Sequence, residues 1–175
     1  MNTNATLEIL HQVVWDFRSN YSHKFATPDV RTSANFAACE AAETLDAWIR
    51  ANTGNEFNRA TIRDRKIEEE VMQCAMMVMT ALGKGFQYDK EKALDSVVEG
   101  KRLWDQLDLV EDLVDEASGV RFLDRPELGP VAYDIGKDYA LAALSTVLAL
   151  VEDPVEVMQR VLGTIYKKRV APEVH

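Results

Sequence analysis

The feature that most limits the fold is the segment IEEEVMQCAMMVMTAL, residues 67–82, which is apolar almost all round from Val71 onward. At about 100° per residue, Glu70, Gln73 and Met77 share one side of a helix, while other apolar side chains occupy the remaining directions. A helix that is hydrophobic on all sides is buried among other helices. This segment therefore predicts a central helix in a helical bundle.

Helical periodicity extends over most of the remaining chain. No segment alternates convincingly with a period of two, and Gly-containing or Pro-containing breaks separate the helical stretches. The pattern predicts helices at about residues 6–20, 33–51, 60–82, 90–116, 131–151 and 154–169. Because a chain of 175 residues is usually one domain, we expect a single all-α domain over 1–175. Its expected architecture is an antiparallel helical bundle of about six helices.

Charge and hydropathy argue against two classes of protein. The formal net charge of -9 and the isoelectric point near 4.9 oppose nucleic-acid binding, since phosphate contacts need clustered Lys and Arg. The longest apolar run, residues 139–151, is shorter than the about 20 residues that span a bilayer. The first residues lack a signal-peptide pattern, and Cys39 and Cys74 show no CxxC spacing, so reduced core thiols are expected. We expect a cytoplasmic protein that binds neither nucleic acid nor membrane.

Three acidic residues are candidates for a cation site. Glu70 stands at the start of the apolar stretch, where an ionised carboxylate is costly unless a cation compensates it. Glu40 and Glu43, one helical turn apart in FAACEAAETLDAWIR, lie on a helix side that also holds Phe36 and Cys39. Carboxylates on facing helices suit a hard cation such as Mg²⁺. The alternative is a solvated role, with Glu70 in a wet first turn and the other two acids on an outer face.

The order of these features resembles a known family. A short amphipathic helix precedes a loop with His23, Phe25 and Thr27-Pro28, and an ExxE helix and an acidic helix that runs into an apolar stretch follow. This order, over residues 5–83, is similar to the all-α nucleoside-triphosphate pyrophosphohydrolases, the MazG-type proteins and their dimeric dUTPase relatives. The basic segment 157–169 looks like the final helix of such proteins.

The family motif is ExxE followed by ExxD, and this chain departs from it at one position. Glu40 and Glu43 match the first pair, and Glu70 matches the Glu of the second. Gln73 stands where the family has Asp, and a neutral amide is a weaker ligand for Mg²⁺ than a carboxylate. Either the site uses fewer charges, or another acid completes it, or the site is degenerate.

The acid that we expect to replace the missing carboxylate is Asp138. It lies in line with Leu141, Ser145 and Leu148 on the helix predicted at 131–151. Asp134, one turn earlier, is the second choice. The alternative is that both acids form a polar first turn that interacts favourably with the helix dipole.

The resemblance implies Mg²⁺-dependent hydrolysis of a nucleoside triphosphate, in particular a deoxynucleotide, to the monophosphate and pyrophosphate. Mg²⁺, or Mn²⁺ in its place, would be held by Glu40, Glu43, Glu70 and Asp138, and Glu40 or Glu69 would be the general base. Substrate contacts stay unassigned. The candidates are the basic residues Lys101, Arg102, Lys167, Lys168 and Arg169 and the aromatic residues Trp15, Phe17, Tyr21 and Phe25.

Two other classes of function fit parts of the chain. A non-catalytic helical interaction module of the same fold is expected if Gln73 has removed metal binding. A di-iron carboxylate bundle needs two ExxH pairs, and the chain offers one, Glu8 with His11.

We also expect a homodimer or a higher homo-oligomer. The helices around 71–82 and 139–151 carry apolar residues around most of their circumference, and one small domain has few helices with which to cover them. Closed two-fold symmetry is the commonest arrangement of such chains. The family resemblance implies the same, because its short members complete their bundle between chains.

Overall fold

The computed structural model describes residues 2–52 and 60–171. Within these residues the chain is helical and contains no strand, which confirms the prediction of an all-α fold. The α-helices are α1 (Thr3–Tyr21), α2 (Val30–Asn52), α3 (Ala60–Leu82), α4 (Asp95–Lys101), α5 (Gln106–Gly119), α6 (Pro130–Leu150) and α7 (Pro154–Ile165). Short 3₁₀ segments lie at η1 (Tyr88–Lys90), η2 (Val120–Asp124) and η3 (Pro126–Leu128), and a π-helical turn, η4 (Tyr166–Val170), extends α7.

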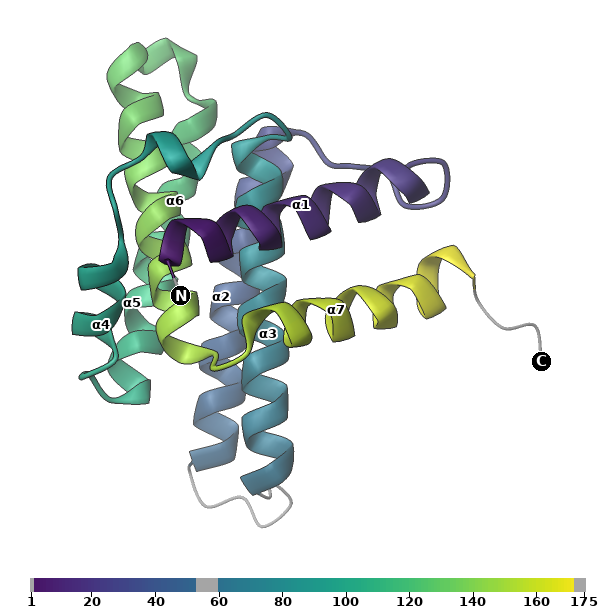
Figure 1. The fold of residues 1–175 in the computed structure, drawn as a ribbon, viewed down its shortest axis with the longest axis vertical. Helices are drawn as coiled ribbons and strands as arrows, with labels where there is room; N and C mark the ends of the chain where they lie inside the picture. The colour runs from purple at the N-terminus through teal and green to yellow at the C-terminus, as the bar shows by residue number, and fades with distance from the viewer. Residues whose placement is uncertain (1, 53–59, 172–175) are drawn as a thin grey trace.

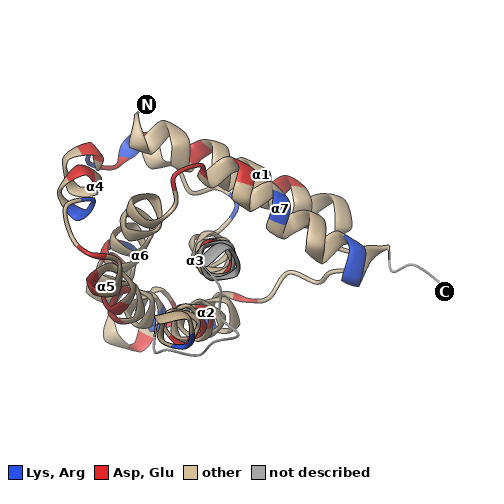
Figure 2. Ribbon diagram, turned by 90° about the horizontal axis from the view of Figure 1, so that it is seen from below, with Lys and Arg blue, Asp and Glu red and all other residues tan. Residues whose placement is uncertain are grey.

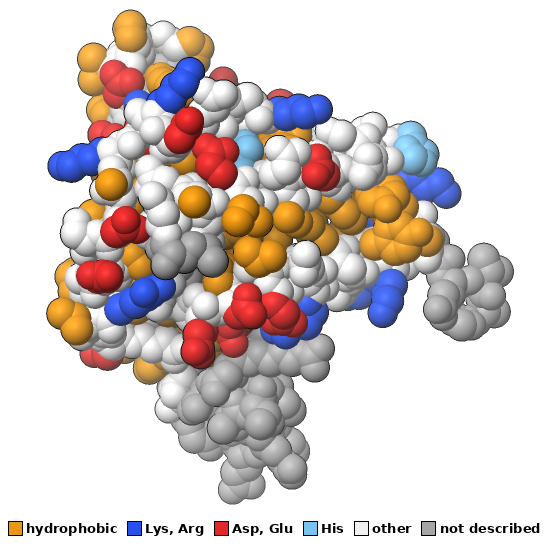
Figure 3. Space-filling model, viewed as in Figure 1, with side chains coloured by type: hydrophobic (Ala, Val, Ile, Leu, Met, Phe, Trp, Pro, Cys, Tyr) orange, Lys and Arg blue, Asp and Glu red, His pale blue; other side chains and the backbone are white. Residues whose placement is uncertain are grey.

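Helix α3 occupies the centre of the bundle. It contacts α1, α2, α6 and α7, and the view along the long axis shows these helices around it (Figure 2). Helices α2 and α3 form an antiparallel pair, and α5 and α6 pack beside it, while α1 and α7 cross these four helices at a steep angle (Figure 1). Apolar side chains line the seam between α1 and α7 (Figure 3). The predicted bundle is therefore present, with two helices laid across it.

The apolar stretch of α3 is buried within one chain. No apolar side chain from Val71 to Leu82 is more than 9% exposed, and most of Ala140–Leu148 in α6 is buried as well. The expectation that a single chain leaves these two helices partly uncovered is wrong, because crossing helices close the bundle. The exposed large apolar side chains of α6 lie in its first half instead, at Val131, Tyr133, Ile135 and Tyr139. Formation of a homo-oligomer stays a prediction.

The helix predicted over 90–116 is in fact two helices. Helix α4 ends at Lys101, and α5 begins at Gln106 after Asp105, whose side chain accepts a hydrogen bond from the backbone N–H of Asp108. An Asp at this position stabilises a new helix start and competes with continuation of the old helix. At the end of α3 the predicted stop is present, since Gly83 adopts a φ of 93° that favours glycine.

Both cysteines are free thiols, as expected, but Cys39 does not lie in the core as predicted. Cys39 is exposed and Cys74 is buried, where its thiol donates to the carbonyl oxygen of Ala37 at 3.4 Å. Burial raises the pKa of Cys74 far above its usual range, and the nearby charges of Glu40 and Glu116 contribute to a smaller extent. A buried thiol in such surroundings is chemically inert. In the described part of the chain, no helix combines the length and the apolar character that crossing a membrane requires.

Candidate metal centre

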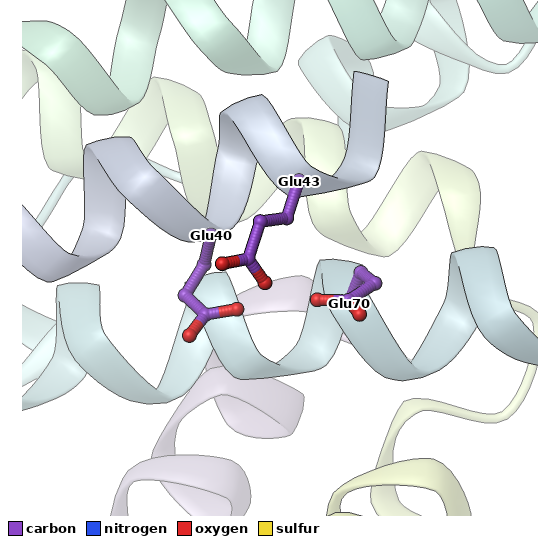
Figure 4. A group of neighbouring side chains, drawn as sticks. All are labelled: Glu40, Glu43 and Glu70. Atoms are coloured by element: carbon purple, nitrogen blue, oxygen red, sulfur yellow. The ribbon is translucent and has the colours of Figure 1, made fainter. Parts of the chain in front are cut away.

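Glu40, Glu43 and Glu70 meet between α2 and α3. Each offers a carboxylate oxygen, and these oxygens lie within 4.8 Å of one another. The antiparallel pairing of the helices produces this arrangement, because two acids one turn apart on α2 face the third acid on α3 (Figure 4). Ligand oxygens that share one Mg²⁺ or Ca²⁺ each lie about 2.0–2.6 Å from the ion, so they are mutual neighbours at such spacings. The geometry thus suits a hard cation.

The three carboxylates differ in how deeply they are buried. Glu43 is exposed, Glu40 is half-buried, and Glu70 is only 4% exposed. Burial is the main cause that raises the pKa of Glu40 from 4.5 to about 8, and the charges of Glu43 and Glu70 and hydrogen bonds to them add to it. Near neutral pH Glu40 therefore keeps a proton that a bound cation would displace.

One oxygen of Glu40 also indicates that the acidic group can bind a cation. Its Oε2 atom is buried and makes no hydrogen bond with any residue that the structure describes. A buried carboxylate oxygen without such a bond is costly unless the group is protonated or neutralised by a cation. The carboxylate donor set, the spacing and this oxygen together fit a divalent cation.

The structure places the other two candidate site residues away from this group. Asp138 is exposed on α6, as is Asp134, and neither belongs to the acidic group found in residues 2–52 and 60–171. The Oε1 atom of Glu69 lies 3.3 Å from Nε of Arg160, so this acid pairs with α7. Of the two candidate general bases, only Glu40 is part of the acidic group.

A cavity of about 490 Å³ adjoins the acidic group. It is large enough for a small ligand. Its lining includes Glu40 and Gln73 as well as Arg18, Phe25, Ala26, Pro28, Phe36, Met76, Met77, Val161, Thr164, Ile165, Lys168 and Arg169. Gln73, which stands where the resembled family has Asp, thus borders the cavity beside a residue of the acidic group.

Several proposed substrate contacts are found in this cavity and several are not. Phe25, Lys168 and Arg169 line it, whereas Trp15, Phe17 and Tyr21 are not part of its wall. Arg18, which the sequence did not single out, also lines it, as does Phe36, which the sequence placed on the helix side of Glu40 and Glu43.

The other basic candidates have different surroundings. Lys101 lies 3.2 Å from Glu116 on α5, where the two form an ion pair. Arg102 borders a separate cavity next to the start of α1. Lys167 is exposed and does not line the cavity beside the acidic group.

The ExxH pair that suggested a di-iron bundle has a structural role. Nε2 of His11 lies 2.8 Å from the carbonyl oxygen of Gly83, which only accepts, so Nε2 carries the proton. Nδ1 therefore accepts from the hydroxyl of Tyr88 at 2.9 Å. Glu8 accepts a hydrogen bond from the backbone N–H of Tyr88. Since both ring nitrogens of His11 are engaged, this pair does not fit a metal site.

Comparison with known proteins found no matching family model, no similar curated protein and no similar solved structure.

Proposed function

We propose that the protein is a divalent-cation-dependent hydrolase that cleaves a nucleoside triphosphate, ribo or deoxy, to the monophosphate and pyrophosphate. The observation that carries the proposal is the meeting of Glu40, Glu43 and Glu70 within 4.8 Å beside a cavity of about 490 Å³. The choice of phosphate bond rests on the resemblance to the all-α pyrophosphohydrolases. The three carboxylates by themselves support only a cation site. The adjoining cavity adds room for a ligand that binds to the cation.

Glu40, Glu43 and Glu70 would hold Mg²⁺, or Mn²⁺ in its place. A bound ion would neutralise phosphate charge and lower the pKa of a water molecule. The buried position of Glu70 fixes one ligand firmly, while exposed Glu43 leaves one side of the site open to solvent. Among the described residues the acidic group has three members, so the site would have modest affinity and substrate phosphates would complete the coordination.

Glu40 is the candidate general base. It borders the cavity and belongs to the acidic group, so its carboxylate would lie close to a water molecule on a bound ion. Glu69, in contrast, pairs with Arg160 and does not line the cavity. A carboxylate in an ion pair with Arg is a weaker base, because the cation favours its ionised form.

The test is turnover of canonical ribonucleoside and deoxynucleoside triphosphates with Mg²⁺ or Mn²⁺. We expect at least one substrate to yield pyrophosphate and monophosphate in equal amounts, and chelation to abolish the reaction. Glu70→Gln, which keeps the side-chain shape, should abolish turnover, whereas Glu111→Gln on the exposed side of α5 should not. Release of orthophosphate in place of pyrophosphate would refute the bond assignment. Absence of metal-dependent turnover across the panel, with the fold intact, would refute the function and leave the interaction-module alternative.

A further inference from the structure

The cavity beside the acidic group also holds an arginine that is buried without a counter-charge. Arg18, near the end of α1, is 1% exposed. Its Nε atom donates to Oγ1 of Thr80 at 2.8 Å, and Nη2 lies 3.6 Å from Sδ of Met77. Nη1 is buried and has no hydrogen-bond partner in the described part of the chain. None of the described acidic residues forms an ion pair with Arg18, although Glu40 lines the same cavity.

A guanidinium in this position is energetically unfavourable by itself. Burying an uncompensated charge is costly, and arginine retains its proton, so the charge stays. Burial lowers the pKa of Arg18 to about 10, which still leaves it protonated at neutral pH. The ring of Phe25, 5.3 Å from the guanidinium carbon, offsets part of the cost. Arg18 also lines a cavity with room for an anion.

Two further cations border the same cavity. Lys168 and Arg169 come from η4, the turn that extends α7, and both contribute to the cavity wall. Neither forms an ion pair with any side chain that the structure describes. Arg18 and the η4 pair thus approach the cavity from two different helices that pack side by side. This convergence is independent of the acidic group.

The positions of residues along α3 give the distance between the acidic group and Arg18. Glu70 belongs to the acidic group, Gln73 lines the cavity one turn later, and Met77 and Thr80 are the residues that contact Arg18. At 1.5 Å per residue, the step from Glu70 to Met77 is about 10 Å along the helix axis. A single phosphate group is too short to reach both ends, whereas a chain of phosphates attached to a nucleoside is not.

We propose that Arg18, with Lys168 and Arg169, binds the distal phosphates of a polyphosphate ligand whose metal-bound end lies at Glu40, Glu43 and Glu70. This inference rests on the proposed function for its substrate class and adds the residues that hold the leaving pyrophosphate. Guanidinium groups suit this task, since they donate two parallel hydrogen bonds to phosphate oxygens. The shared chemistry of the ligand is a phosphate chain, with or without a nucleoside.

The test measures binding in metal-free protein with a chelator present, so that no turnover is needed. Isothermal calorimetry would compare inorganic triphosphate, inorganic phosphate, a nucleoside triphosphate and an uncharged nucleoside. We expect both triphosphates to bind, with phosphate weaker and the nucleoside weakest. Arg18→Met should weaken triphosphate binding by roughly ten-fold or more. The matched control is Arg31→Met, which removes the same charge from an exposed position on α2.

Thermal unfolding without ligand gives a second readout. Arg18→Met should unfold at a higher temperature than the unmodified protein, because an uncompensated buried charge is removed. If Arg18→Met does not fold, the double variant Lys168→Gln and Arg169→Gln carries the same binding test. Triphosphate binding unchanged in both variants would refute the inference. Triphosphate binding that depends on Arg18 in a protein without metal-dependent turnover would instead refute the proposed function alone.

Discussion

The raised pKa of Glu40 predicts how the stability of the metal-free protein depends on pH. In the unfolded chain this carboxyl group ionises near 4.5, whereas in the folded protein it does so near 8. Between these values the unfolded state loses a proton that the folded state keeps, so rising pH favours unfolding. The stabilising contribution of Glu40 is therefore complete below pH 4.5 and is lost as the pH rises through about 8. Glu40→Gln removes this dependence.

The size of the effect follows from the same two pKa values. A rise from 4.5 to about 8 corresponds to at most about 5 kcal/mol in the free energy of unfolding. Glu40 is only half-buried and its neighbour Glu43 is exposed, so water screens the repulsion. We expect about 1–2 kcal/mol of this to be measurable between pH 5 and pH 9. Glu40→Gln should be about as stable as the unmodified protein near pH 5 and more stable near pH 9.

The assay is urea unfolding at several pH values with a chelator present, with Glu111→Gln as the control for loss of one surface charge. Adding Mg²⁺ at pH 8 should stabilise the unmodified protein and have little effect on Glu40→Gln, because binding of the ion requires the carboxylate. Parallel stability curves for the unmodified protein and Glu40→Gln from pH 5 to pH 9 would refute the reasoning. A gain of Glu40→Gln that is as large at pH 5 as at pH 9 would refute it too.

Three further predictions follow from the site and the surface. Gln73→Asp, which introduces the acid of the resembled family, should tighten Mg²⁺ binding roughly ten-fold, or about 1.4 kcal/mol, in calorimetry; unchanged affinity would mean that residue 73 does not reach the ion. Glu69→Gln should leave turnover intact and lower the free energy of unfolding by about 0.2–1 kcal/mol, as expected for a partly exposed ion pair with Arg160; loss of turnover would show that Glu69 takes part in the mechanism. The chain should sediment as a homodimer or higher oligomer at micromolar concentration, and a clean mass near 19.7 kDa would contradict this.

Local sequence patterns predicted the parts of the structure that depend on local rules. The centre and the end of α3 follow from its apolar periodicity and from Gly83. The approach of Glu40, Glu43 and Glu70 follows from two consecutive helices that pack antiparallel, since such a pair brings one face of each helix together. The break between α4 and α5 was missed because the cap at Asp105 competes with a pattern that continues through it.

Features that depend on distant helices were not predictable in this way. Arg18 lies in the last turns of an amphipathic helix, where a basic residue is usually a solvated partner of the helix dipole. Its burial arises because α1 crosses α3 and packs beside α7, and nothing near residue 18 indicates this crossing. Asp138 is the converse case. It is in line with a buried face, but it is exposed, because the buried positions in the first half of α6 are Ala132, Gly136 and Ala140.

The cavity unites two features that are each unfavourable in the absence of a ligand. Half-buried Glu40 shares space with other acids and has an elevated pKa, while Arg18 is a buried cation without a carboxylate partner in the described residues. Both line one cavity, yet they form no ion pair with each other, although mutual compensation would be the simplest way to reduce both costs. Keeping the two charges apart leaves the acid available to a cation and the guanidinium available to an anion. A metal-bound phosphate chain has both charges in one ligand, and this complementarity supports our proposal that the substrate carries such a chain.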